Sequence, residues 1–177
     1  LNFSVESTQV TISPDRESVF ITINVKEGDI HTVTEITLSG NPMIPEAEIR
    51  ELIIQKEGEE FSQILMTISA EKIAARLGND GYAFAEVKGV PDINKEDKTA
   101  KLIFYIDPGT RAYVRRIEFR GNTKTMDEVL RREMRQIEGA TASTEMIEWS
   151  KNRLQRTGFF KTVETETRPV PGVSDQI

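Results

Sequence analysis

The feature that most constrains this chain is an irregular phrase that it contains twice. EGDIHTVTEITLSGN occupies residues 27–41 and PGTRAYVRRIEFRGN occupies residues 108–122, with a spacing of 81 positions from Glu27 to Pro108. The matched positions are Gly28 with Gly109, Val33 with Val114, Ile36 with Ile117, Leu38 with Phe119 and Gly40 with Gly121. A repeat that keeps register through glycines and an alternating segment predicts a structural module copied in tandem.

The segments on either side of the phrase repeat at the same offset. ITINVKEG (21–28) aligns with LIFYIDPG (102–109), and both are predicted strands that stop at a glycine turn. IRELIIQKEG (49–58) aligns with LRREMRQIEG (130–139), and each is predicted to be a short helix with its glycine at the C′ position. The stretch TMDE at 125–128 has the spacing of a capping box, which places the start of the second helix there.

The rest of the module is predicted to be a longer helix followed by an aromatic strand. The register changes by four residues, which we place in the loop between the two helices. Beyond it, RLGNDGYAFAEV (76–87) aligns with RLQRTGFFKTV (153–163). The longer helix of the first copy has an apolar stripe at helical spacing, made up of Met66, Ala70, Ile73 and Leu77. One module therefore reads strand, helix, helix, strand, strand.

This element order predicts an α+β fold in three parts. Residues 1–30 hold the final two strands of one module, residues 31–109 a whole module, and residues 110–177 a module without its last strand. Two antiparallel helices are expected to cover one face of a three-stranded mixed sheet with the strand order first, third, second. The second strand is then an open edge, which can bind an extended peptide by strand addition. The short tether at 109–114 is expected to fix the angle between modules.

Residues suited to catalysis or metal binding are sparse. The chain has no cysteine, its single histidine is His31 at a module junction, and no serine has a recognisable base. DINKED (92–97) resembles the start of a calcium loop, but Asp97 and Ile103 stand where that loop needs glycine and glutamate, so we predict a hairpin loop. Trp149 is predicted to be a core or interhelix packing residue rather than a ligand platform. We therefore predict a binding protein with no catalytic residue, no cofactor and no metal.

A nucleic-acid-binding module shares part of this element order. The KH module has a β-α-α-β core and grips the nucleic-acid backbone through a GxxG loop between its helices. The corresponding loops here read EGEEF and EGATA, and the chain carries a net charge of −6. An acidic turn in an acidic chain repels phosphate, so we expect no salt-dependent binding of nucleic acid.

The tandem module with this glycine pattern resembles the POTRA (polypeptide-transport-associated) domain, which forms the periplasmic arm of outer-membrane assembly barrels. The blocks that carry the resemblance are STQVTISPD, PDINKEDKTAKL, YVRRIEFRGN, VLRREMRQIEG and GFFKTVETETRPVPG. The resemblance implies the end of a third domain, a complete fourth domain and most of a fifth. It also implies a periplasmic location, contact with the barrel domain of the same chain, and contact with unfolded outer-membrane proteins. The arm of a related transport barrel is the alternative.

The resemblance implies a first partner site on the strand TQVTI at residues 8–12. Val10 and Ile12 flank Thr11 and would face one side of the strand together. In POTRA arms of this kind, the edge of this strand docks a β-propeller lipoprotein (BamB-like). The alternative is that Val10 and Ile12 pack under the helices of their own module. Prolines, such as Pro91, interrupt the equivalent strands of the other modules.

The resemblance implies a second partner site at the end of the short helix 130–139. Glu138 is the charge expected to contact a BamD-like lipoprotein, and Arg131 and Arg135 would frame it on nearly the same helix face. The alternative is that Glu138 forms an exposed intrahelical ion pair with Arg135, three residues earlier. Glu57 holds the same place in the previous module, so the Glu-Gly ending can also be purely structural.

Two further charges are candidates for the same contact. Glu118 and Arg120 flank Phe119 on the predicted first strand of the last module. Many POTRA relatives carry these two charges in the opposite order. An ion pair from these positions to the partner would therefore be reversed or absent in this chain.

Overall fold

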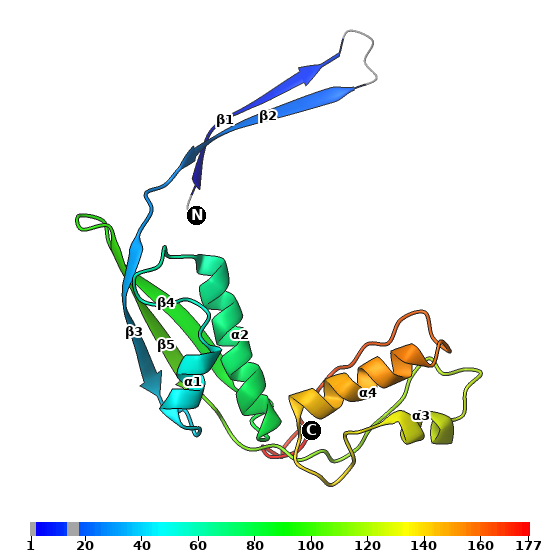
Figure 1. Ribbon diagram of the computed structural model, residues 1–177. Coiled ribbons are helices and arrows are strands. Elements are labelled where there is room, and N and C mark those ends of the chain that lie inside the picture. The colour runs from blue at the N-terminus through cyan, green and yellow to red at the C-terminus, as the bar shows by residue number, and fades with distance from the viewer. Residues whose placement is uncertain (1–2, 14–17) are drawn as a thin grey trace.

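The computed structural model describes residues 3–13 and 18–177, without the side chains of Phe3, Ser4, Ile12, Lys26 and Glu27. Figure 1 shows a long hairpin, a module of sheet and helices, and a second module whose helices lie near the C-terminal part of the chain. The hairpin projects away from the two modules, and the lower end of the long helix of the first module meets the start of the long helix of the second.

The hairpin pairs β1 (Phe3–Ile12) with β2 (Val19–Glu27) in antiparallel fashion. Both strands are rich in β-branched residues, which suit a pleated strand. Val10 lies opposite Ile21, and the two residues are 60% and 64% exposed. No helix precedes the hairpin among the described residues, so the exposure of Val10 is compatible both with an edge site and with packing beneath the helices of its own module.

The first module contains the predicted three-stranded mixed sheet. Its strands are β3 (Thr32–Gly40), β4 (Glu86–Asn94) and β5 (Thr99–Asp107), in the order β3-β5-β4. β3 pairs with β5 in parallel, and β4 pairs with β5 in antiparallel fashion across a tight hairpin loop. The predicted order of first, third and second strand is thus confirmed, and Pro91 lies on the edge strand β4, where a missing N–H is tolerated.

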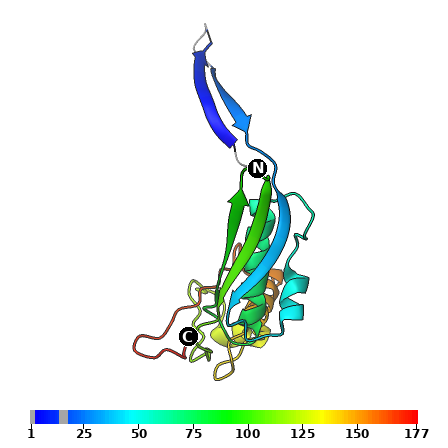
Figure 2. The same ribbon diagram turned by 90° about the vertical axis from the view of Figure 1, so that its left-hand side faces the viewer.

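Two helices, α1 (Glu46–Leu52) and α2 (Gln63–Asn79), cover one face of this sheet, as the view in Figure 2 shows. The predicted apolar stripe of α2 is buried against the inner face of β5, so its assignment is confirmed. Burial of the apolar side chains of this core is the main source of stability for the module. The core side chains include Val33, Ile49, Met66, Ala70, Ile73, Leu77, Leu102, Phe104 and Ile106.

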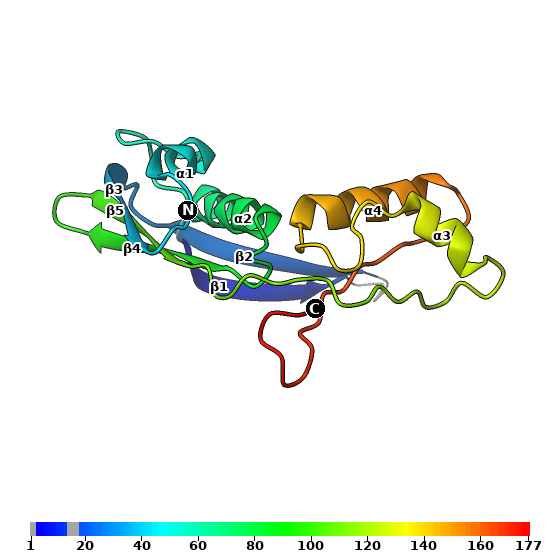
Figure 3. The same cartoon turned by 90° about the horizontal axis from the view of Figure 1, so that it is seen from below.

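The second module repeats the helical layer with α3 (Asp127–Glu133) and α4 (Thr144–Arg156). Figure 3 shows all four helices on the same side of the molecule. Val114 is buried and exchanges backbone hydrogen bonds with the 139–140 turn, as Val33 does with the 58–59 turn. The two valines therefore have the like surroundings that a tandem repeat requires.

The sheet of the second module is incomplete. Residues 114–120 and 160–170 form no ladder, although strands are predicted there. The ladder needs a central strand, and residues 174–177 form only its first bridge, in which Tyr113 pairs in parallel with Gln176. The Tyr113 N–H donates to the Asp175 carbonyl at 2.8 Å, and the Arg115 N–H donates to the Ile177 carbonyl at 2.7 Å.

The predicted position of the four-residue register change is wrong. The N-cap residues Ser62 and Ser143 still lie 81 positions apart, as do Ser69 and Ser150 further along the helices. The change falls in the helix itself, because α2 has 17 residues and α4 has 13. Four residues are about one helical turn, so α4 keeps its register with α2 and ends one turn earlier.

The predicted ends of the short helices are also wrong. α1 ends at Leu52 and α3 ends at Glu133, several residues before the glycines at 58 and 139. In each module, a buried serine of the longer helix accepts a backbone N–H just beyond the short helix, and the short helix ends there. Ser69 Oγ accepts from the Ile54 N–H at 3.0 Å, and Ser150 Oγ accepts from the Arg135 N–H at 2.8 Å. Both glycines lie in the turn that follows.

The predicted capping box of the second module does not form, and Trp149 is not in the core. The N-cap of α3 is Met126, with no side-chain cap, so the capping box at 125–128 does not form. The Thr125 carbonyl instead accepts a hydrogen bond from the Asn122 amide. Trp149 is 51% exposed and is not a core residue. The small Ser150 takes the inward position on α4 because its hydroxyl accepts backbone hydrogen bonds from residues 135 and 136.

Candidate partner-binding sites

The site at Glu138, which lies in the turn after α3, is built around the backbone of one residue, Ile117. Glu138 Oε1 accepts the Ile117 N–H at 2.7 Å, and an Arg131 guanidinium nitrogen donates to the Ile117 carbonyl at 3.1 Å. Arg131 also pairs with Glu138 Oε1 at 3.2 Å and with Asp127 at 3.5 Å. Its guanidinium lies 5.6 Å from the centre of the Phe119 ring, within cation–π distance. Arg131 and Glu138 are thus brought together, as predicted.

These contacts keep Glu138 charged. The Ile117 N–H, and then the Arg131 guanidinium, lower the pKa of the Glu138 carboxyl below its ordinary value. Stability from a lowered carboxyl pKa is present above the pKa of the unfolded chain and is lost as the pH falls through the folded pKa. The carboxylate is therefore an anion at neutral pH, with its side chain 39% exposed.

Arg135 is not part of this arrangement. Its guanidinium donates to the Met134 carbonyl at 3.1 Å, and no ion pair joins it to Glu138 in the part of the chain described. The reason is that α3 ends at Glu133, so Arg135 and Glu138 lack the helical spacing that would place them together. Both the predicted intrahelical pair and the predicted shared helix face of Arg131 and Arg135 are wrong.

Glu118 and Arg120 lie on the extended segment beside this site. Glu118 is held between two arginines, Arg116 and Arg120, the latter at 3.3 Å. The arginines lower the pKa of the Glu118 carboxyl, with Arg116 as the larger cause. In this structure, therefore, the Glu118 and Arg120 charges pair with each other.

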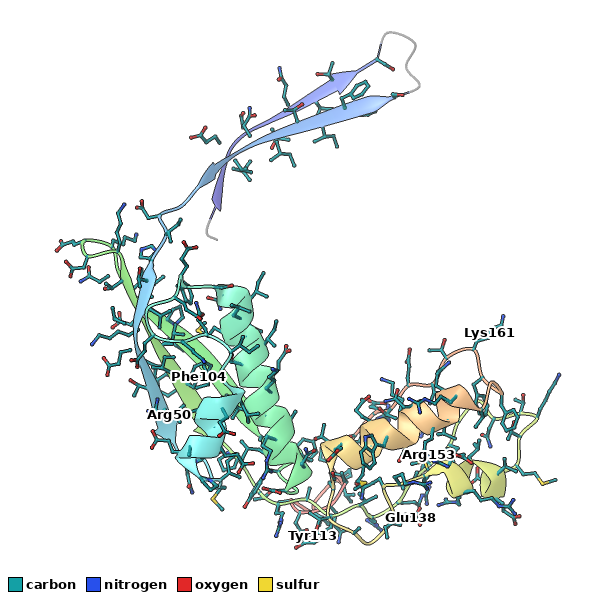
Figure 4. All side chains as sticks on the ribbon, in the orientation of Figure 1. Arg50, Phe104, Tyr113, Glu138, Arg153 and Lys161 are labelled. Carbon is teal, nitrogen blue, oxygen red and sulfur yellow. The ribbon has the colours of Figure 1, made fainter. Side chains whose placement is uncertain are left out.

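The equivalent place in the first module shares only half of this geometry. Arg50 donates to the Ile36 carbonyl at 3.4 Å and pairs with Glu46, as Arg131 does with Ile117 and Asp127. Glu57, however, has no hydrogen bond or ion pair to any described residue. Figure 4 shows Arg50 and Glu138 on their separate modules. The carboxylate contact to the 114–120 segment therefore occurs in the second module and has no counterpart at Glu57 in the first.

The hairpin site has a simple geometry. Thr11 and Val10 lie on β1 with exposed side chains, and Thr11 is paired with Phe20 of β2. The Ile12 backbone pairs with Val19, but its side chain lies outside the part that the structure describes. Each strand of a two-stranded hairpin leaves one edge unpaired, so β1 can accept a further strand.

The joint between the two modules includes Arg111 and Ala112 of the predicted 109–114 tether, and also a contact between the long helices that the sequence analysis missed. The last turn of α2 reaches the second module, where the Asn79 side-chain oxygen accepts the Glu145 N–H at the start of α4 at 2.9 Å. The Gly81 carbonyl accepts the Ala112 N–H at 2.8 Å, and Arg111 Nε donates to the Asp80 carbonyl at 2.7 Å. The signal in the sequence was the four additional residues that extend α2 by one turn, and the stretch GNDG at 78–81 where that turn ends.

The described residues contain no group of three or more histidine, cysteine, aspartate or glutamate side chains that could hold a metal ion. The same residues contain no helix with the length and apolarity needed to cross a bilayer. The features that stand out are backbone edges and half-exposed charges, which are suited to binding other polypeptides.

The sequence matches the family "POTRA: Surface antigen variable number repeat" over residues 31–109 and 112–176. These two matches coincide with the two modules of the structure and cover well over half of the chain. The chain belongs to the POTRA family.

Within that family, the chain is similar to the outer membrane protein assembly factor BamA. It is 33% identical to BamA of Neisseria meningitidis over 99% of this chain and 22% of that protein, and 34% identical to BamA of Buchnera aphidicola over 92% of this chain and 26% of that protein. A crystal structure of Haemophilus influenzae BamA POTRA3-5 matches with a TM-score of 0.89 at 34% identity, covering 98% of this chain and 69% of that one. The chain thus resembles the periplasmic POTRA part of an outer-membrane protein.

Proposed function

We propose that the chain is a periplasmic arm in the assembly of outer-membrane proteins and that it acts by binding polypeptides rather than by catalysis. The observation that carries this proposal is the match of all three parts, in one arrangement, to POTRA3-5 of a BamA. On this basis residues 1–30 end a third domain, residues 31–109 form a fourth, and residues 110–177 form most of a fifth. The open edges of β1 and β4 support strand addition as the way in which partners or unfolded substrate strands bind.

We propose further that Glu138 and Arg131 contact a BamD-like accessory lipoprotein. The support is a carboxylate that stays charged at neutral pH, is half-exposed, and is held in one position by two contacts. A charge held in place in this way loses little conformational freedom when a partner binds. Arg135 and the Glu118–Arg120 pair are exposed nearby and belong to the rim of the same proposed surface.

Glu138→Lys is expected to weaken binding of a BamD-like lipoprotein by roughly tenfold or more, because a charge reversal replaces an attraction with a repulsion. The measurement is the lipoprotein affinity by surface plasmon resonance. Glu57→Lys is the matched control, since Glu57 holds the same place in the first module, and it should bind as the unmodified chain does. Amide spectra of residues 110–177 check folding. A Glu138→Lys variant whose second module unfolds would show that the site is structural.

We also propose that β1 docks a BamB-like β-propeller through its edge. The double change Val10→Glu and Ile12→Glu is expected to reduce propeller binding to the background level, because two charges would be brought against a strand–strand contact. Val25→Glu on β2 is the control, since Val25 is 52% exposed but lies near the other end of the hairpin. Equal propeller affinity for the unmodified chain and the double variant would contradict this assignment.

A further inference from the structure

We propose that the outer edge of residues 114–120 is a second strand-addition site, closed in this structure by the side chains of Arg131 and Glu138. Its occupant is an extended segment of another polypeptide that pairs with the backbone of Ile117 and Phe119. This edge is distinct from the β1 and β4 edges, and the inference concerns the second module alone. It does not depend on which lipoprotein the arm binds.

The direction of each backbone group along this segment follows from its hydrogen bonds. Tyr113 and Arg115 bond to residues 175–177, on the inner side where the central strand begins. Val114 bonds on the outer side, donating to the Ala140 carbonyl at 2.9 Å and accepting from the Gly139 N–H at 2.7 Å. These bonds form the start of an outer edge that already pairs with backbone.

The backbone N–H and C=O of Ile117 point to the same outer side as those of Val114. Its N–H and its C=O both bond to side chains that come from α3 and the 134–139 turn. If the backbone N–H and C=O groups alternated strictly between the two edges from Val114 onward, those of residue 116 would point outward. β3, however, has a register shift between Val33 and Glu35, which are equivalent to residues 114 and 116. With that shift, Ile117 and Phe119 face outward, and residues 116, 118 and 120 face inward.

Arg131 and Glu138 therefore occupy both backbone groups that a neighbouring strand would use at Ile117. The two side chains are 44% and 39% exposed, so water is available to solvate them once they are displaced. Ion pairs this exposed contribute little, and an incoming strand would replace their contacts with two backbone hydrogen bonds. Charged side chains placed on an exposed edge are a common way to prevent unwanted strand pairing.

The other outward-pointing backbone groups on this edge are those of Phe119. The backbone of Phe119 has no hydrogen-bond partner among the residues that the structure describes. The exposed charges of the segment are the three arginines at 115, 116 and 120 and a single glutamate at 118. This positive balance favours an extended strand with acidic or uncharged side chains over a basic one.

The first test is hydrogen exchange of backbone amides by NMR in the 177-residue chain. Glu138→Ala should speed exchange at the Ile117 amide by about tenfold or more, because its acceptor is removed. Glu57→Ala is the matched control and should leave the Ile36 amide unchanged. Unaltered exchange at Ile117 in Glu138→Ala would overturn the proposal.

The second test uses a synthetic peptide, Glu-Val-Thr-Val-Thr-Val-Thr-Glu, as the strand. Glu138→Ala should bind it about fivefold or more tightly than the unmodified chain, with the largest amide shifts at Ile117 and Phe119. Equal affinity would overturn the proposal, as would shifts centred on the inward amides of residues 116 and 118 or on β4. Glu138→Gln keeps the size of the side chain and supplies the same comparison if the alanine variant loosens the module.

Neither test includes a lipoprotein. A failure of lipoprotein binding by Glu138→Lys would therefore leave these outcomes unaffected. Conversely, an edge that stays closed in Glu138→Ala would leave the proposed lipoprotein contact standing.

Discussion

Gly40→Ala is expected to lower the free energy of unfolding of the 31–109 module by about 3–5 kcal/mol. Gly40 ends β3 with a φ of +102°, a conformation that side chains other than glycine rarely adopt. A Cβ there would overlap the Ile106 carbonyl oxygen and lie 3.1 Å from its carbonyl carbon. The obstacle is the backbone of the central strand β5, which cannot move aside without disturbing the whole sheet.

The second module provides the matched control for this prediction. Gly121 is the repeat equivalent of Gly40 and has a φ of +82°, but nothing lies within 4 Å of its would-be Cβ. Gly121→Ala should therefore cost only the backbone strain, about 1–2 kcal/mol. Urea unfolding followed by amide signals of each module measures both values. Equal losses at the two positions would show that contact with β5 contributes nothing.

Gly81→Ala is expected to destabilise the joint between the modules by about 2–4 kcal/mol. Gly81 has a φ of +102°, and a Cβ there would overlap the Thr141 methyl group and lie 2.7 Å from Arg111 Cγ. Both neighbours belong to the 110–177 part of the chain. Relieving the overlap would separate the Gly81 carbonyl from the Ala112 N–H that it accepts.

Residual dipolar couplings of the two modules measure this effect on the joint. The unmodified chain should fit one alignment tensor for residues 31–177, and Gly81→Ala should need two. Gly58→Ala is the control, because Gly58 also has a positive φ of +89° but no atom within 4 Å of a Cβ. A single tensor for Gly81→Ala would mean that the glycine contact does not hold the modules together.

The joint has a consequence for the proposed arm. Asn79 of the first module caps the first turn of α4 in the second, so the start of α4 is positioned by a neighbouring module. The Glu138 site is attached to α4 through the Ser150 hydrogen bonds to the turn at 134–139. A change at Gly81 is therefore transmitted to the orientation of the Glu138 site relative to the first module.

Much of the fold was predictable from local pattern. The repeat at an offset of 81 predicted two like modules, and Val33 and Val114 do lie in like surroundings. The stripe on α2 predicted its buried face, because apolar residues at helical spacing must face the same side. The edge position of β4 was predictable from Pro91, which cannot donate a ladder hydrogen bond.

The errors at the ends of the short helices share one cause, which is that a side chain distant in the sequence competes with a local signal. Gly58 and Gly139 look like helix caps in sequence, but Ser69 and Ser150 draw the chain out of each helix earlier by accepting backbone N–H groups. Both serines recur at the 81-residue offset, and that recurrence was the available clue. Trp149 has a large apolar side chain of the kind expected in a core. Its neighbour Ser150 nevertheless holds the inward position on α4, because the Ser150 hydroxyl accepts backbone hydrogen bonds.

The amino-acid sequence alone determined the module, its strand order and the residues of its core, because hydrophobic period and glycine placement act over neighbouring positions. Tertiary structure decided where the helices end, which partner Glu138 has, and how the two modules meet. Those features depend on hydrogen bonds between groups far apart in the chain, such as Glu138 with Ile117 and Asn79 with Glu145. No local pattern specifies such a pair, because its geometry exists only once both elements are packed.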